Sequence, residues 1–230
     1  MSDARIAFVF PGQGSQKVGM GRDWADAFAE SHRVFEEADE VLGFGLTELC
    51  WQGPEEELAL TANLQPALVA TSVAILRAVE TTGVRPVAVA GHSLGEYSAL
   101  VAAGALEPAD ALTLTRRRGE LMQDAVPVGD GAMAAILALD DDTVRGIVSE
   151  VAEGEVLSVA NLNAPGQVVV AGHRGAVERA VEAARERRGK PRMLPVSAPF
   201  HCPLMAPARE GLEPLLRRTR FRDPAVPVVT

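Results

Sequence analysis

The stretch VAGHSLGE, residues 89–96, constrains the fold more than any other part of the chain. A short apolar strand leads into the pattern Gly-x-Ser-x-Gly and then into a helix-forming run from Tyr97 to Ala103. Gly91 and Gly95 allow a sharp turn and a close helix approach, where a Cβ would clash. Strand, turn and helix in this order predict that Ser93 sits at the tip of the turn, with its hydroxyl near a helix N-terminus. The alternative is a glycine-flanked serine in an ordinary strand-to-helix loop.

Composition supports an α/β class. Apolar residues make up 47% of the 230 residues and aromatic residues only 4%, which suits helices packed on a parallel sheet. The net charge of −9 argues against a nucleic-acid-binding surface. No apolar run approaches the length of a membrane span, and the apolar segment 6–10 lacks the features of a signal peptide, so we expect a cytoplasmic protein. Cys50 and Cys202 form neither a metal-binding nor a redox pair.

The two ends of the chain predict one α/β domain. Apolar strands are expected at 5–10, 86–90 and 226–230. Helices are expected at 21–30, 31–42, 55–60, 65–82, 94–103 and 108–125, and one more between Met205 and about Arg220. Gly83 is the expected stop signal of the strongly apolar helix 65–82.

The middle of the chain has a different pattern. A strand at 132–139, a helix at 141–152, strands at 156–162 and 167–171, a helix at 175–188 and a strand at 192–196 are predicted. This β-α-β-β-α-β order is typical of a ferredoxin-like unit. We therefore predict an α/β-hydrolase-like parallel-sheet large subdomain, residues 1–128 and 197–230, with an inserted ferredoxin-like small subdomain, residues 129–196.

A serine nucleophile needs a base, because a free hydroxyl is barely ionised at neutral pH. The chain has four histidines. His92 adjoins Ser93 and is expected to project elsewhere, while His32 and His173 are expected to face solvent. His201 lies in the kinked segment between Pro199 and Pro203, where the chain leaves the small subdomain. It is therefore the candidate base, and a neutral structural histidine is the alternative.

Five motifs follow one another along the chain in a characteristic order. They are FVFPGQGSQ at 8–16, GHSLGE at 91–96, RG and MQ at 118–119 and 122–123, NAPGQ at 163–167, and APFH at 198–201. In this order and spacing the chain resembles malonyl-CoA:acyl-carrier-protein transacylases and the related acyltransferases of polyketide synthases. The resemblance runs the whole length of the chain.

The resemblance implies a reaction and the residues that carry it. In that family a serine attacks the thioester of malonyl-CoA, and the acyl-serine is then taken by the phosphopantetheine thiol of the carrier protein. Ser93 matches the nucleophile and His201 the base. Gln13 and Leu94 match the positions whose backbone N–H groups form the oxyanion hole. Arg118 matches the arginine that grips the malonyl carboxylate with its planar fork.

Further matches concern the substrate pocket and the partner. Phe200 stands where family members that select unbranched malonyl carry a bulky aromatic residue, and packing in the core is the alternative. Other pocket-lining matches are Met133, Asn161 and Asn163. Lys190 and Arg192 match the region that meets the acidic acyl carrier protein, and a solvated surface is the alternative. The resemblance implies malonyl-CoA as substrate and no bound cofactor, metal, nucleic acid or membrane.

Family members continue beyond the position where this chain ends, Thr230. The resemblance implies that the additional segment supplies a glutamine or asparagine carbonyl that orients the histidine, and a further strand with its helices. The chain is therefore expected to be either a fragment or a weakened or non-catalytic copy. A truncated protein that only binds carrier protein or a synthase partner is a further alternative.

Another activity stays open. A serine esterase or thioesterase would explain Ser93 and His201 but not Arg118, and the oxyanion motif His-Gly-Gly-Gly is absent. The sequence does not distinguish fatty-acid from polyketide synthesis.

Overall fold

The computed structural model describes residues 5–196 and 198–230, which form two compact units. Unit 1 comprises the chain up to Glu120 together with Leu212–Thr230, and unit 2 comprises Leu121–Gly211. The subdomain boundaries predicted from the sequence, at 129 and 196, stay predictions, and both fall inside unit 2.

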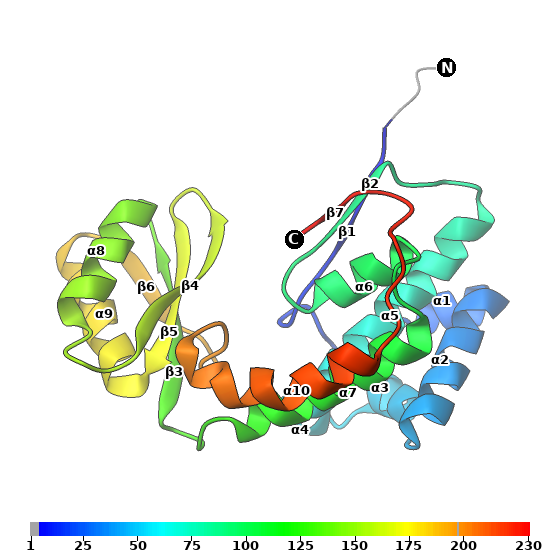
Figure 1. Ribbon diagram of the computed structural model, residues 1–230, viewed down its shortest axis with the longest axis horizontal. Coiled ribbons are helices and arrows are strands. Elements are labelled where there is room, and N and C mark those ends of the chain that lie inside the picture. Colours follow the sequence, from blue (N-terminus) through cyan, green and yellow to red (C-terminus); the bar gives the residue numbers. More distant parts are fainter. Residues whose placement is uncertain (1–4, 197) are drawn as a thin grey trace. The chain divides into compact units, whose positions relative to one another are not determined.

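Unit 1 is built on a parallel sheet, as the apolar strands predicted. Its strands are β1 (Ala7–Phe10), β2 (Ala88–Gly91) and β7 (Val228–Val229), in the order β1-β2-β7 (Figure 1). The pairs β1–β2 and β2–β7 are both parallel. Phe10 at the end of β1 pairs with Gly91 at the end of β2, so the two segments that follow these strands leave the sheet at the same edge.

Helices account for most of the rest of unit 1. They are α1 (Arg22–Ala27), α2 (Ala29–Leu42), α3 (Leu46–Gln52), α4 (Glu55–Leu58), α5 (Thr61–Thr81), α6 (Gly95–Ala102), α7 (Pro108–Asp124) and α10 (Ala206–Arg218), the last two of which extend into unit 2. The sequence analysis missed α3, and it placed the start of α5 at residue 65 instead of Thr61.

Helix α5 is the core helix of unit 1. With 21 residues, the helix is long and apolar enough to cross a membrane, which the sequence analysis did not anticipate. However, 78% of its apolar window is buried inside the described structure. Large side chains such as Leu64, Leu68 and Val73 are at most 5% exposed. Burial of this kind is typical of the central helix of a soluble protein.

Unit 2 contains the predicted β-α-β-β-α-β unit. Its elements are β3 (Gly131–Leu137), α8 (Asp141–Val151), β4 (Leu157–Ala164), β5 (Gln167–His173), α9 (Arg174–Glu186) and β6 (Lys190–Met193). The sheet order is β4-β5-β3-β6 and every neighbouring pair is antiparallel. This is the strand order of a ferredoxin-like fold, and the prediction is confirmed.

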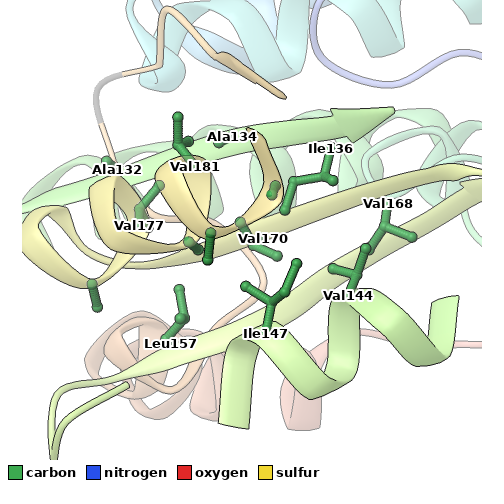
Figure 2. Packing of buried hydrophobic residues seen from close by; sticks show 14 residues of the cluster. Ala132, Ala134, Ile136, Val144, Ile147, Leu157, Val168, Val170, Val177 and Val181 are labelled. Atoms are coloured by element: carbon green, nitrogen blue, oxygen red, sulfur yellow. The ribbon is translucent and has the colours of Figure 1, made fainter. Parts of the chain in front are cut away.

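The two faces of the sheet in unit 2 carry different side chains. One face packs against α8 and α9, with Ile136, Ile147 and Val177 completely buried between them (Figure 2). The other face carries Met133, which packs with Phe200 in a second apolar cluster. Because side chains alternate along a strand, neighbouring residues of β3 belong to opposite faces. The second face is therefore the one that receives the segment around His201, which continues into the short 3-10 helix η1 (Pro203–Met205).

Candidate functional site

Ser93 occupies the turn between β2 and α6 with a strained backbone. Its φ is 51°, in the left-handed region that non-glycine residues rarely adopt. A Cβ on Gly91 would lie 2.1 Å from the carbonyl carbon of Gly95, and a Cβ on Gly95 would lie 2.3 Å from the carbonyl oxygen of Phe10. Both positions therefore require glycine. The strain at a serine between strand and helix is typical of a nucleophile presented at a sharp turn.

The turn after β1 lies directly against this serine turn. The backbone N–H of His92 donates to the carbonyl oxygen of Phe10 at 3.0 Å. A Cβ on Gly12 would lie 2.5 Å from the carbonyl oxygen of His92, so the backbones are in close contact. This contact brings Gln13 and Ser93 to the same edge of the parallel sheet.

Two backbone N–H groups are available beside the serine turn. Leu94 is the N-cap residue of α6, and its side chain is buried. Among the described residues, the N–H groups of Leu94 and Gln13 donate to no other protein group. N–H groups at a helix N-terminus and in a glycine-rich turn favour an anion. The arrangement can therefore stabilise negative charge that develops next to Ser93.

Arg118 on α7 is half-buried in unit 1. One of its guanidinium nitrogens, Nη1, donates to Oε1 of Gln65 at 2.7 Å, and the guanidinium carbon lies 5.9 Å from the centre of the Tyr97 ring. Burial lowers the pKa of Arg118, while Tyr97 and Glu96 act in the opposite direction. An arginine stays protonated in a protein in spite of such a shift. Unit 1 therefore contains a positive charge that is held in place by Gln65 and Tyr97.

The neighbouring arginines differ from Arg118 in their partners. Arg116 and Arg117 both form ion pairs with the carboxylate of Glu120, at 2.8 and 3.1 Å. Within residues 5–196 and 198–230, Arg118 forms no ion pair with a carboxylate. A partly buried cation without a direct ion pair favours a ligand that supplies a negative charge. Arg118 is thus suited to bind a carboxylate of a substrate.

His201 belongs to unit 2 and also has a strained backbone. Its φ is 60°, and its side chain is exposed. The preceding residue, Phe200, is 6% exposed and the following residue, Cys202, is 9% exposed, so both neighbours anchor the segment in the second apolar cluster. The Cys202 thiol donates to the carbonyl oxygen of Pro199 at 3.0 Å, and burial raises its pKa. Cys202 is therefore a packed thiol, and His201 alone projects from this segment as a candidate base.

The remaining predicted site residues also lie in unit 2. Met133 is buried on β3 and packs in the same cluster as Phe200. On β4, Asn161 is half-buried and Asn163 is exposed. Lys190 and Arg192 are exposed on β6, a strand at the edge of the sheet. The structure thus groups Gln13, Ser93, Leu94 and Arg118 in unit 1, and the other predicted residues in unit 2.

Sequence reasoning missed two residues that hold Arg118. Gln65 is completely buried on α5, and Tyr97 is half-buried on α6. The sequence did contain a signal for Gln65, namely an amide side chain within a strongly apolar helix. Such a side chain needs a polar partner when it is buried. In the part of the chain that the structure describes, no group of three or more His, Cys, Asp or Glu side chains is arranged to hold a metal ion.

Comparisons with known proteins identify relatives along the whole chain. The family model "Acyl transferase domain" matches residues 7–230. The malonyl CoA-acyl carrier protein transacylase of Escherichia coli K12 is 52% identical over 98% of this chain and 74% of the relative. The transacylase of the same name from Bacillus subtilis strain 168 is 49% identical over 99% of this chain and 72% of the relative.

Solved structures agree with the sequence comparisons. A crystal structure of an acyl carrier protein S-malonyltransferase from Vibrio cholerae superimposes with a TM-score of 0.96, at 48% identity, over 99% of this chain and 75% of that chain. A malonyl-transacylase in complex with its type II PKS acyl-carrier protein gives a TM-score of 0.96 at 49% identity, over 99% of this chain and 74% of that chain.

Replacement of Gly95 by alanine tests the contact between the serine turn and β1. We expect Gly95→Ala to lower the free energy of unfolding by about 2 kcal/mol, because the new Cβ meets backbone atoms that cannot rotate away. Labelling of Ser93 by a fluorophosphonate should slow as the turn is displaced. Urea unfolding and intact mass after labelling measure the two effects.

Gly146→Ala on α8 is the matched control, because its Cβ would enter open space. It should stabilise the protein by about 0.5–1 kcal/mol and leave labelling unchanged. Equal stability and labelling in both variants would contradict the packing argument.

Proposed function

The chain belongs to the acyl transferase domain family, and we propose that it transfers a malonyl group from malonyl-CoA to the phosphopantetheine thiol of an acyl carrier protein. The observation that carries the proposal is Ser93, held at φ 51° between β2 and the N-terminus of α6. The named relatives at about 50% identity are malonyl CoA-acyl carrier protein transacylases. The reaction proceeds through an acyl-enzyme and needs no cofactor, since both half-reactions exchange one acyl group between a thiol and a hydroxyl.

In the first half-reaction, the Ser93 hydroxyl attacks the thioester carbonyl of malonyl-CoA. The proposed role of His201 is to take the hydroxyl proton as the bond between oxygen and carbon forms. The N–H groups of Gln13 and Leu94 stabilise the negative charge on the carbonyl oxygen. The carbon–sulfur bond then breaks, the CoA thiol leaves with the proton from His201, and malonyl-Ser93 remains.

The second half-reaction runs the same steps in reverse with a different thiol. The phosphopantetheine thiol of the carrier protein loses its proton to His201 and attacks the ester carbon. The bond to the serine oxygen breaks, and His201 returns the proton to Ser93. No water takes part, so exclusion of water from the acyl-enzyme decides between transfer and hydrolysis.

Arg118 supplies selectivity for malonyl over acetyl. Malonyl carries a free carboxylate, and a guanidinium can hold both of its oxygens with two parallel hydrogen bonds. Arg116 and Arg117 both form ion pairs with Glu120. Arg118 has only Gln65 as a polar partner among the described side chains. Of the three arginines, Arg118 is therefore the one proposed to bind the malonyl carboxylate.

Several residues of unit 2 also have proposed roles. Phe200 is proposed to crowd an α-methyl group and so to favour malonyl over methylmalonyl, with Met133 behind it in the same cluster. Asn161 and Asn163 are proposed to line the pocket from β4. The exposed cations Lys190 and Arg192 on β6 are proposed to meet the acidic carrier protein. A cytoplasmic location fits these partners and belongs to the proposal.

Hydrolysis is the second candidate function, because a serine with an oxyanion hole also serves esterases and thioesterases. Loading distinguishes the two activities. After mixing with malonyl-CoA, intact mass should show a persistent malonyl adduct that is lost in Ser93→Ala and passes to an acyl carrier protein when one is added. Rapid release of free malonate without an adduct would establish hydrolysis instead. Carrier-protein binding that survives Ser93→Ala, with no loading in the unmodified chain, would establish a non-catalytic binding protein.

Replacement of Arg118 tests the carboxylate grip. Arg118→Ala should reduce kcat/KM for malonyl-CoA by about 100-fold, because a charge-assisted two-point contact is lost. Transfer of acetyl, which has no carboxylate, should be unchanged or faster. The measurement is the rate of loading of each acyl group on Ser93, and an equal loss for both groups would remove the assignment.

Replacement of Phe200 tests the discrimination against branched acyl groups. Phe200→Ser should raise the ratio of methylmalonyl to malonyl loading by about tenfold, the factor typical of space for one methyl group. Val169→Ala truncates another side chain of the same cluster and serves as the control for general loosening. If Phe200→Ser leaves the ratio unchanged, or if Val169→Ala raises it equally, Phe200 acts only in packing.

A further inference from the structure

Gln65 is the only described side chain that offers Arg118 a hydrogen-bond acceptor, and it does so from an unusual place. It lies on α5 between apolar residues, and its side chain is completely buried. A buried amide in such a helix costs stability unless its polar atoms are satisfied. The contact from Arg118 Nη1 to Gln65 Oε1, 2.7 Å long, satisfies the carbonyl oxygen and fixes one edge of the guanidinium.

The charge of the acceptor distinguishes this contact from those of the neighbouring arginines. Arg116 and Arg117 are held by the carboxylate of Glu120, which neutralises their charge. The amide of Gln65 holds Arg118 without neutralising it. An arginine carries five N–H donors in a fixed fork, so a single acceptor on one edge leaves donors for a second partner. The second partner must bring the negative charge that Gln65 lacks.

The first turn of α5 fixes the position of Gln65 relative to α7. Pro66 has no N–H, and in a regular helix this N–H would bond the carbonyl of Ala62, four residues earlier. That carbonyl instead accepts a hydrogen bond from Nη1 of Arg116 at 3.2 Å. A Cβ on Gly119 would lie 2.5 Å from the carbonyl oxygen of Thr61, so α7 touches the backbone of α5. These contacts on both sides of Arg118 set the register in which it meets Gln65.

We propose that Gln65 is a positioning and specificity residue, whose neutral amide orients the Arg118 guanidinium and preserves its charge for the carboxylate of the acyl group. The proposal rests on the proposed function, because it concerns the acyl group that Arg118 binds. Gln65 does not touch the reacting atoms in this account. It acts through Arg118, and its effect is therefore expected in the discrimination between acyl groups.

Gln65→Glu tests the proposal with almost no change in side-chain shape. The new carboxylate would form a permanent ion pair with Arg118 and compete with the carboxylate of malonyl. The ratio of malonyl to acetyl loading, each as kcat/KM, should fall at least about tenfold, mainly through a higher KM for malonyl-CoA. Acetyl loading should stay within about twofold of the unmodified chain.

Asn63→Asp is the matched control for the introduction of a carboxylate. Asn63 lies two residues before Gln65 on the same helix, and its Oδ1 accepts a hydrogen bond from Arg116. The substitution adds the same charge next to a different arginine, and the malonyl-to-acetyl ratio should not change. An equal fall of the ratio in both variants would overturn the proposal, because the effect would then be one of net charge.

A second variant, Gln65→Met, and a binding measurement test the same proposal if Gln65→Glu is unstable. Methionine keeps the volume and neutrality but removes the acceptor, so KM for malonyl-CoA should rise several-fold more than KM for acetyl-CoA. In a Ser93→Ala background, calorimetry should show weaker malonyl-CoA binding in both Gln65 variants and unchanged acetyl-CoA binding.

The outcomes separate this inference from the proposed function. If the unmodified chain loads malonyl and both Gln65 variants keep its preference, Gln65 has no such role although the function stands. If both variants lose malonyl and acetyl loading equally, Gln65 serves only packing. If the unmodified chain loads neither group, the proposed function fails, while the binding measurement still tests whether Gln65 controls the preference for a carboxylate.

Discussion

The close backbone contact between the turns that follow β1 and β2 is the constraint on which the site in unit 1 depends. Parallel pairing of Phe10 with Gly91 brings both strands to the same edge, and glycines at 12 and 95 let the two turns touch. Each glycine faces a backbone carbonyl at 2.5 Å or less, so neither tolerates a side chain. The result is a serine in a left-handed conformation beside N–H groups from two separate segments.

The three arginines of α7 differ in the partners that their charges receive. Helix α7 presents three consecutive arginines, and within the described residues only two of them form an ion pair with a carboxylate. Partial burial of Arg118 beside a neutral amide and an aromatic ring removes water from a cation that has no direct ion pair among the described residues, and a bound anion would offset this cost. Selectivity of this kind reduces the stability of the unliganded protein, which is common where binding sites are strained or uncompensated.

The sequence predicted the architecture well because its signals were local. The turn at Asn163–Gly166 and the alternating strands around it identified the ferredoxin-like unit, and the glycines around Ser93 identified the serine turn. Helix α3 was missed because glycines at 43, 45 and 53 surround a short segment that resembles a loop. The predicted start of α5 at residue 65 was wrong because the helix continues through Pro66 to Thr61, and Arg116 compensates the carbonyl that this proline leaves free. The proposed role of Gln65 depends on a residue 53 positions away, which no local pattern reveals.

The alternation of side chains along β3 links the fold of unit 2 to the proposed pocket. On β3, Ala132, Ala134 and Ile136 face α8 and α9 (Figure 2). Met133 belongs to the opposite cluster, which anchors Phe200. A shift of one residue in the register of β3 would exchange these two sets completely. The helices that cover one face therefore fix, through the alternation of side chains, which residues support the His201 segment on the other. In this way an ordinary packing requirement of the small α/β unit determines the surroundings of the proposed base.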